Sequence, residues 1–345
     1  MDWKKLVVGV SALAVALITA GTAIAQDRNS LIEGAKKEGK LNVGTSAPGD
    51  GFPKFLAAFK EKYPFIDVTS GYFTAPTGRV LARVGAEVDA RNVTIDVIHV
   101  ANMAAYIDMQ IKGQLAEYMS PEYSALPAGT KHDGYWATAR AIGVIMTYNK
   151  NKLSEADAPK SWKDLLAPKW KGKKFAIQGS SSGTSFSQFY QLEEIYGPDF
   201  MKQLAAQEPV VMTSGGQIID AVVRGEILVG GAIDHWTAFT DSARQAGLLP
   251  IFPTEGTPIS LAPIAIVKGS PNPNAARLFM DFILSQEGQK LLNTDIYGLW
   301  STRKDVAPPT GQSPMSDAKP LLPKDMATYS KASETFAERF QQTFR

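Results

Sequence analysis

Small hydroxyl-bearing residues form a dense run, GSSSGTS, at positions 179–185, directly after the apolar segment KFAI. The first five residues match G-x-S-x-G, the pattern of hydrolases that carry a nucleophilic serine on a strand-to-helix turn, which would make Ser181 the nucleophile. The same residue types at a helix start can instead bind an anion, because free backbone N–H groups and the helix dipole favour negative charge there. The run therefore points either to an enzyme or to a receptor.

A serine hydrolase of this pattern also needs an acid and a histidine that follow the nucleophile along the chain. His235 is the only histidine after Ser181, and it directly follows Asp234. Neighbouring side chains in an extended segment point to opposite faces, so Asp234 cannot orient His235, although Asp220 or Asp241 could take that role. Because the sequence also has no HGGG-type loop for an oxyanion hole, hydrolysis is kept only as a remote alternative.

Three further loops share this composition, because each places hydroxyl or amide side chains between an apolar run and an amphipathic stretch. They follow LNV near residue 43, IDVIHV near residue 100 and PVVM near residue 212. Each could be an ordinary helix cap, since Ser, Thr and Asn are preferred at that position. Four such loops at predicted strand ends instead favour one shared anion-binding cleft. Its candidate residues are Thr45, Ser46, Asn102, Ser181, Ser182, Gly183, Thr184, Ser214 and Gly215.

Three larger side chains could complete such a cleft. Arg79 begins a predicted helix and would form a bidentate clamp on an anion if it turned inward; otherwise it is a solvated surface residue. Asp234 could accept a hydrogen bond from an amine or hydroxyl, and Trp236 could stack on a ring or alkyl chain or simply fill the core. Asp234 and Trp236 together would also suit a cationic amine, through charge pairing and cation–π contact.

The alternation of short apolar runs with longer amphipathic ones predicts an α/β protein. The expected helices cover residues 31–37, 52–62, 78–90 and 103–113, and the expected strands cover residues 41–45, 66–72 and 95–100. Alternation of this kind implies mostly parallel sheets flanked by helices, with ligands bound beyond the carboxyl ends of the strands. The candidate loops lie at those ends.

The N-terminus carries the features of a secretory signal peptide over residues 1–25. Lys4 and Lys5 precede an apolar segment, and Ala23-Ile24-Ala25 predicts cleavage before Gln26 and a periplasmic location. A membrane anchor is disfavoured because the apolar segment is short and no later segment offers about 20 uninterrupted apolar residues. The chain has no Cys, so its fold rests on its hydrophobic core. A formal net charge of +2 without a long basic run argues against nucleic acid as a partner.

Four longer stretches resemble the substrate-binding proteins of ATP-binding-cassette (ABC) importers. These stretches are DGYWATARAIGVIMTYNKNKL, PKSWKDLLAPKWKGKKFAI, GEILVGGAID and PTEGTPISLAPIAIVKGSPNPNAARLFMDFILSQEGQKLL. The branch they resemble is the type 2 periplasmic one that includes ferric-ion-binding proteins and their relatives for organic anions. The resemblance covers nearly the whole chain after residue 25.

This resemblance implies two α/β lobes joined by crossing strands, with the ligand held in a cleft between them. One lobe would comprise residues 26–140 and 259–302, and the other residues 143–257 and 306–345, with the C-terminal helices packing across the lobes. It further implies a monomeric receptor without a cofactor or catalytic activity. Its partners would be a small solute and a permease with its ATPase at the inner membrane.

Ferric iron and an organic anion are both ligands of such proteins. The ferric-binding relatives use two adjacent tyrosines, and Trp236 and Thr237 stand where this pair would be. Neither can offer an ionised oxygen, and His99 and His132 form no metal-ligand pattern. We therefore expect a carboxylate, phosphonate or sugar phosphate as the solute. The first alternative is ferric iron bound through tyrosines outside the motif, which are Tyr72, Tyr106, Tyr148 and Tyr190. The second alternative is a cationic amine.

Overall fold

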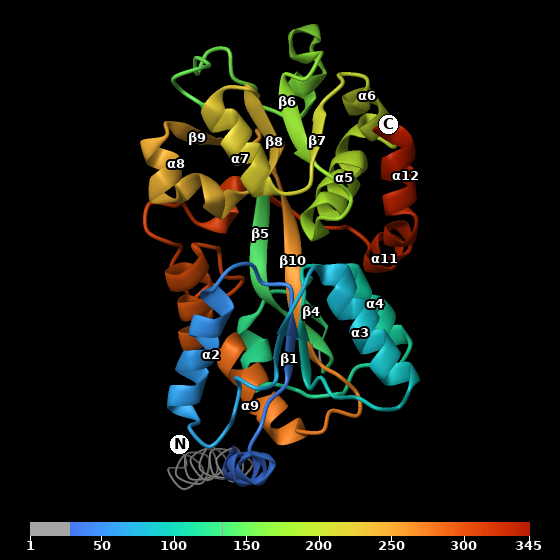
Figure 1. Ribbon diagram of the computed structural model, residues 1–345, viewed down its shortest axis with the longest axis vertical. Helices are drawn as coiled ribbons and strands as arrows, with labels where there is room; N and C mark the ends of the chain where they lie inside the picture. The colour runs from blue at the N-terminus through green and yellow to red at the C-terminus, as the bar shows by residue number, and fades with distance from the viewer. Residues whose placement is uncertain (1–27, 133) are drawn as a thin grey trace, which may run out of the picture.

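Two α/β lobes, one above the other in Figure 1, make up the protein. The structure is a computed structural model that describes residues 28–132 and 134–345, so the predicted signal peptide lies outside the described residues. Two long strands run along the axis of the molecule and join the lobes: β5 (Trp136–Asn149) and β10 (Thr257–Ile266). The two-lobe α/β fold expected from the sequence is thus confirmed.

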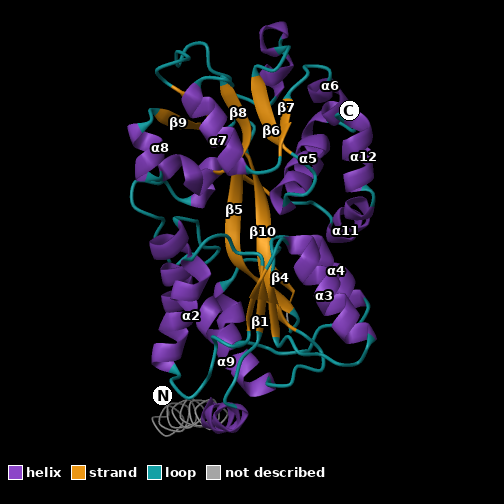
Figure 2. Ribbon diagram, viewed as in Figure 1, coloured by secondary structure: helices purple, strands orange, loops and turns teal. Residues whose placement is uncertain are grey.

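The strands form one connected sheet in the order β2-β1-β3-β10-β5-β8-β6-β7. In the lower lobe of Figure 2, β1 (Val43–Thr45) pairs in parallel with β2 (Tyr72–Thr74) and β3 (Val97–His99). In the upper lobe, β6 (Phe175–Gln178) pairs in parallel with β7 (Val210–Met212) and β8 (Val229–Asp234). The two joining strands pair antiparallel with each other; β10 also pairs antiparallel with β3 of the lower lobe, and β5 with β8 of the upper lobe. Short strands at the margins are β4 (Lys131–His132), β9 (Leu248–Ile251) and β11 (Pro320–Leu321).

Helices cover both faces of the sheet in each lobe. The lower lobe carries a helical segment at residues 28–38 together with α2 (Gly51–Lys62), α3 (Thr77–Asp89), α4 (Met103–Ile111), α9 (Pro273–Leu284), α10 (Gln286–Gln289) and the π-helical η5 (Lys290–Tyr297). The upper lobe carries α5 (Gly183–Tyr196), α6 (Phe200–Ala205), α7 (Gly215–Arg224) and α8 (Asp241–Gln245), and the chain ends in α11 (Met326–Glu334) and α12 (Phe336–Thr343). Short 3-10 turns are η1 (Pro121–Ala125), η2 (Lys163–Leu166), η3 (Pro168–Trp170), η4 (His235–Phe239) and η6 (Met315–Ala318).

The predicted strand from Ile66 is wrong in its position. Regular pairing begins only at Tyr72, because the Asp67 carboxylate accepts hydrogen bonds from the backbone N–H groups of Thr69 and Ser70 at 2.9 and 3.3 Å. A side chain that binds its own backbone two and three residues ahead makes a turn and removes those groups from a strand ladder. The alternating pattern around Val68 therefore belongs to a turn that leads into β2.

Aromatic side chains form much of the core in both lobes. In the lower lobe, Phe52, Phe55 and Phe59 lie three and four residues apart on α2 and contact Phe279 and Phe282 of α9. In the upper lobe, α5 packs against the C-terminal helices; the contacting rings are Phe186, Phe189, Tyr329, Phe336 and Phe340. The last helices thus complete the core around α5.

Helix α11 also touches the lower lobe (Figure 1). The Tyr329 hydroxyl lies 2.7 Å from the Ser187 hydroxyl of α5. The neighbouring Ser330 donates from its hydroxyl to the Ala104 carbonyl oxygen of α4 at 3.2 Å. Consecutive residues of one helix are therefore hydrogen-bonded to different lobes.

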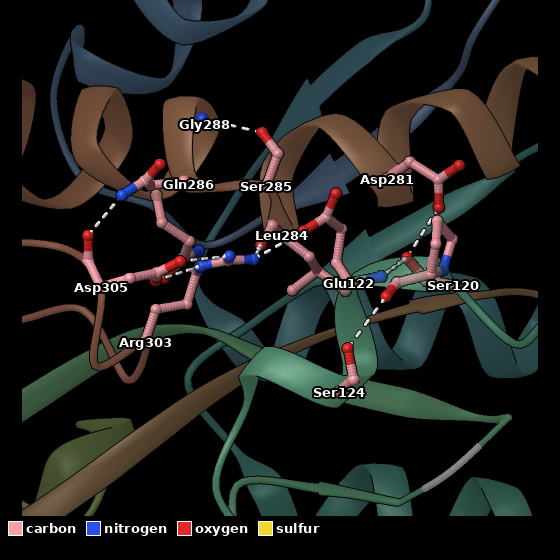
Figure 3. A network of polar contacts seen from close by, with 12 residues as sticks. Ser120, Glu122, Ser124, Asp281, Leu284, Ser285, Gln286, Gly288, Arg303 and Asp305 are labelled. Atoms are coloured by element: carbon pink, nitrogen blue, oxygen red, sulfur yellow. Dashed lines mark hydrogen bonds and ion pairs between the residues drawn. The ribbon is translucent and has the colours of Figure 1, made fainter. Parts of the chain in front are cut away.

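A network of charged side chains fixes the segment that follows η5 (Figure 3). Arg303 is 7% exposed, and its Nε and Nη2 donate to the Asp305 carboxylate at 2.8 and 2.7 Å. Its Nη1 donates to Glu122 at 2.6 Å and to the Leu284 carbonyl oxygen, at the end of α9, at 2.9 Å. One guanidinium group thus joins three separate parts of the chain.

We predict that Arg303→Ala lowers the free energy of unfolding by about 2 kcal/mol, because it leaves two carboxylates and a buried carbonyl without their donor. Urea denaturation monitored by circular dichroism measures this loss. Arg224 is the matched control, since it pairs with Glu226 at the same two-residue spacing but both side chains are more than half exposed. Arg224→Ala should leave the unfolding midpoint unchanged, and equal effects of the two changes would contradict the role given to Arg303.

Candidate functional site

The loops after β1 and β3 are tied together where the lower lobe faces the upper one. The Thr45 hydroxyl donates to the His99 carbonyl oxygen at 2.9 Å and accepts from the Ala47 backbone N–H at 3.0 Å. The Ser46 hydroxyl accepts from the Ala101 backbone N–H at 3.3 Å. Thr45 and Ser46 therefore brace the floor of the gap between the lobes.

The start of α5 in the upper lobe meets this floor directly. A Cβ atom at Gly183 would lie 2.2 Å from the carbonyl oxygen of Ala101, which leaves no room for any side chain. Next to this contact, the hydroxyls of Ser182 and Thr184 lie 2.8 Å apart, and Thr184 is buried. The serine run and the Thr45 loop, which belong to different lobes, thus both adjoin Ala101.

The four predicted helix starts differ in how their cap residues are used. Asn102 accepts from the Ala105 N–H at 3.2 Å, and Ser214 accepts from the Gln217 N–H at 3.3 Å, so both are ordinary caps of α4 and α7. Gly215 lies beside Ser214 in the first turn of α7. The Ser182 hydroxyl, at the cap position of α5, makes no hydrogen bond to a backbone N–H of the helix and instead pairs with the hydroxyl of Thr184. Ser182 is therefore not an ordinary helix cap.

A buried arginine that the sequence patterns did not indicate lies on β5, the strand that crosses between the lobes. Arg140 of β5 is 3% exposed, and its Nε donates to Nε2 of His99 at 2.8 Å. His99 Nδ1 lies 3.0 Å from the Pro263 carbonyl oxygen, so Nδ1 carries the proton and Nε2 accepts. Burial and the Arg140 charge hold the pKa of His99 well below its usual value. His99 is thus a neutral acceptor that aims the guanidinium group.

Arg140 keeps its two terminal nitrogens free of hydrogen bonds to the described residues, and it forms no ion pair with them. Its guanidinium lies 5.5 Å from the ring centre of Tyr297. Arg79, by contrast, is exposed in the first turn of α3. The sequence signal for Arg140 is its position: it is the one charged residue in the apolar strand WATARAIGVIMTYN, all of which is buried.

Asp234 is the last residue of β8 in the upper lobe. Its Oδ1 atom is buried and has no hydrogen-bond partner among the described residues, although the residue as a whole is only half-buried. Burial raises the pKa of Asp234 to about 6, an effect opposed by the charge of Arg140 and by the side chains of Trp236 and Thr184. Arg140 and Asp234 therefore interact electrostatically without a direct ion pair.

Aromatic residues border the gap. Trp236 is half-buried and lines a pocket of about 320 Å³ together with residues 48–51, Lys54 and residues 295–297. The Tyr297 hydroxyl donates to the Pro48 carbonyl oxygen at 3.0 Å, and the hydroxyl of Tyr72 is buried without a partner among the described residues. Trp236 is thus half-buried, packs against the core of the lower lobe and lines this pocket.

The tyrosines named as alternative iron ligands do not gather in the gap. Tyr106 donates to the Pro263 carbonyl oxygen at 2.7 Å and accepts from the Val100 N–H at 2.9 Å, and burial raises its pKa. Tyr148 pairs with Leu249 in the upper lobe, and Tyr190 packs against Tyr329 of α11. Within residues 28–132 and 134–345, no three His, Asp or Glu side chains are grouped as a metal site.

The arrangement around Ser181 and His235 does not resemble a catalytic triad. Ser181 is exposed, whereas His235 is fully buried where β5 crosses between the lobes. His235 Nδ1 accepts from the Gly143 N–H at 3.0 Å, and its ring stacks on Trp300 at a centroid distance of 3.9 Å. Burial lowers the pKa of His235 to about 3. His235 is thus a neutral structural residue of the crossing.

Comparison with known proteins identifies the class. Residues 54–324 match the model of the bacterial extracellular solute-binding protein family, and the chain belongs to that family. It is 29% identical over 305 residues to an uncharacterised protein of Haemophilus influenzae, covering 84% of this chain and 83% of that one. It is also 28% identical over 173 residues to the Fe(3+)-binding periplasmic protein of Serratia marcescens, covering 47% of this chain and 50% of that relative.

Solved structures share the fold at lower sequence identity. Iron-bound HitA of Pseudomonas aeruginosa superposes with a TM-score of 0.76 at 21% identity, over 87% of this chain and 99% of HitA. AfuA of Actinobacillus pleuropneumoniae with bound fructose-6-phosphate gives a TM-score of 0.76 at 23% identity, over 88% of this chain and 98% of AfuA. The protein is therefore a periplasmic-type solute-binding protein, as the sequence motifs implied. No helix in the described part of the chain has the length and apolar character needed to cross a bilayer.

We predict that Gly183→Ala opens the gap. The added methyl group would meet the Ala101 carbonyl oxygen at 2.2 Å and disfavour the contact by about 2 kcal/mol, while the helix itself tolerates alanine well. Small-angle X-ray scattering should show a larger radius of gyration than for the wild type. Gly216→Ala is the control, because a methyl group there meets nothing closer than 3.9 Å. Identical scattering from both variants would show that the lobes do not meet at Gly183.

We also predict a pH-dependent stability effect of Asp234→Asn. The pKa of Asp234 is raised from 3.8 to about 6 in the folded state. Ionisation of Asp234 therefore lowers the free energy of unfolding above about pH 6, and this loss disappears below about pH 4, where the carboxyl group is protonated in both states. The variant should have a higher melting temperature than the wild type at pH 7.5, and the gain should fade towards pH 4. Scanning calorimetry tests this, with exposed Asp241→Asn as the control; a gain independent of pH would contradict it.

Proposed function

We propose that this protein is the periplasmic receptor of an ABC importer, and that it captures a small organic anion between its lobes and presents it to a permease. The observation that carries this proposal is that the Arg140 guanidinium group is buried without a salt bridge to the described residues. Arginine stays charged in proteins, and a buried charge without a counter-ion is costly. Arg140 is buried, is aimed by a neutral histidine and forms no salt bridge with the described residues. A carboxylate or phosphate group of the solute is the partner that fits this guanidinium.

Neighbouring groups support the same ligand class. The α5 start presents Ser182, Gly183 and Thr184 to the gap, and the helix dipole adds partial positive charge there. Closure of the lobes excludes water and strengthens each hydrogen bond to the solute. A solute that binds the closed form better shifts the population towards it, and the closed form is what a permease would recognise.

The crossing strands divide the chain into the lobes that we propose: residues 26–140 with 259–302, and residues 143–257 with 306–345. The receptor acts as a monomer without catalysis. Binding of fructose-6-phosphate is described for AfuA, and a sugar phosphate is accordingly one member of the anion class proposed for this chain.

Ferric iron is the ligand in the names of several relatives. It is the weaker candidate here, because a trivalent cation beside Arg140 would be repelled and because iron would have to displace the proton of a buried phenol. The pKa of Tyr297 is raised to about 12 by burial, and Tyr72 is the remaining phenol of the gap. Mixing the protein with ferric citrate should produce no visible phenolate charge-transfer band.

We predict that Arg140→Gln weakens binding of the best ligand among fructose 6-phosphate, citrate and inorganic phosphate by at least about 30-fold, because it removes a desolvated charge partner. Isothermal titration calorimetry measures the change. Arg79→Gln is the matched control, and its exposed side chain should alter affinity less than about threefold. A large effect of Arg79→Gln with none of Arg140→Gln would instead make Arg79 the anion clamp.

A further inference from the structure

A second charge, of opposite sign to Arg140, faces the gap from the other lobe. In the antiparallel pairing of β5 and β8, Asp234 lies opposite Val144, and residues directly opposite each other project to the same face of a sheet. Arg140 lies four residues before Val144 on β5 and shares that face, because side chains alternate with a period of two. The register alone therefore directs Arg140 and Asp234 to one side of the sheet.

The two charges are spaced apart along the strand. Four residues of β-strand span about 13 Å between Cα atoms, of which the long arginine side chain covers only part. In agreement with this spacing, Arg140 and Asp234 influence each other's pKa yet form no direct ion pair. Arg140 on β5 and Asp234 on β8 therefore lie within electrostatic range of each other without direct contact.

The carboxyl group of Asp234 interacts with the side chains of Trp236 and Thr184, which lower its pKa, but one of its two oxygens is left without a donor. Its Oδ1 atom is buried and has no hydrogen-bond partner in the described part of the chain. A buried acceptor left without a donor costs free energy, and an ionised one costs more. An anion without a hydrogen-bond donor would pair with Arg140, but it would bring a second negative charge towards Asp234. It would also leave Asp234 Oδ1 without a hydrogen bond.

We propose that the solute carries, beside its anionic group, a hydroxyl or ammonium donor that binds Asp234, so that the receptor selects hydroxylated or aminated anions over plain anions of the same size. This inference rests on the proposed function, since it takes Arg140 as the anion partner. It assigns Asp234 the role of a specificity residue. A simple cationic amine is excluded by the same geometry, because its charge would face the Arg140 guanidinium.

The pocket beside Trp236 adds room for the rest of such a molecule. Its volume of about 320 Å³ adjoins the end of β8, two residues beyond Asp234. The indole ring offers an apolar face on which a short carbon chain or the apolar side of a sugar can lie. The solute is thus expected to be compact, with its polar groups spaced along a chain of a few carbon atoms.

Two matched ligand series test this inference by calorimetry with the full mature chain. Propyl phosphate, glycerol 3-phosphate and O-phosphoethanolamine share a phosphate ester and differ in the donor they carry. Succinate, malate and aspartate do the same for a four-carbon diacid. In the series that binds, we expect the hydroxyl or ammonium member to bind about 10- to 100-fold more tightly than the plain anion, the range for a hydrogen bond to a charged group.

Asp234→Asn and Asp234→Leu identify the residue responsible. In Asp234→Leu the advantage of the donor-bearing ligand should fall to less than about threefold, and the plain anion should bind at least as tightly as it does to the wild type. In Asp234→Asn, which keeps an acceptor oxygen, the ammonium ligand should lose more affinity than the hydroxyl ligand. Melting temperatures of both variants establish that they are folded.

The outcomes separate this inference from the proposed function. If all members of a series bind equally and neither Asp234 variant changes their order, while Arg140→Gln still abolishes binding, the inference is wrong and anion binding stands. If no member of either series binds the wild type, or if Arg140→Gln leaves the affinity unchanged, both proposals fail. Retained discrimination in Asp234→Leu would also refute the role of Asp234.

Discussion

A buried guanidinium group that the protein aims but does not neutralise is the interaction on which the site depends. His99 accepts from Arg140 Nε and is itself fixed by the Pro263 carbonyl oxygen of β10, so both joining strands and β3 contribute to its orientation. Hydrogen bonding by a neutral ring orients the cation without cancelling its charge. Under the proposed function, an anionic solute would supply the counter-charge that the guanidinium group lacks.

The upper lobe adds what the lower lobe lacks. It supplies the hydroxyls and backbone N–H groups at the α5 start, the acceptor Asp234 and the flat side chain of Trp236. Each half of the site is incomplete by itself, because the cation and its counterparts sit on different lobes. The proposed receptor function would therefore couple affinity for the solute to closure of the lobes.

Periodicity and turn chemistry were sufficient to predict the α/β class and most element positions. The strand at Ile66 was misplaced because the Asp67 side chain competes for the backbone there. Arg140 was missed because only the fold brings its hydrogen-bond chain together. Its partner His99 lies 41 residues away in the sequence, and Pro263, which fixes His99, lies 164 residues from His99. Its charge within a fully apolar strand was the available signal.

Both lobes are assembled from distant pieces of chain. The lower lobe's strand β3 pairs with β10, and the aromatic core around α5 is completed by Tyr329, Phe336 and Phe340 near the C-terminus. While the chain is being synthesised, neither core can close before the later segments have appeared. The core of each lobe is then complete only when later parts of the chain are available, an order of assembly that fits the export predicted from the N-terminal sequence.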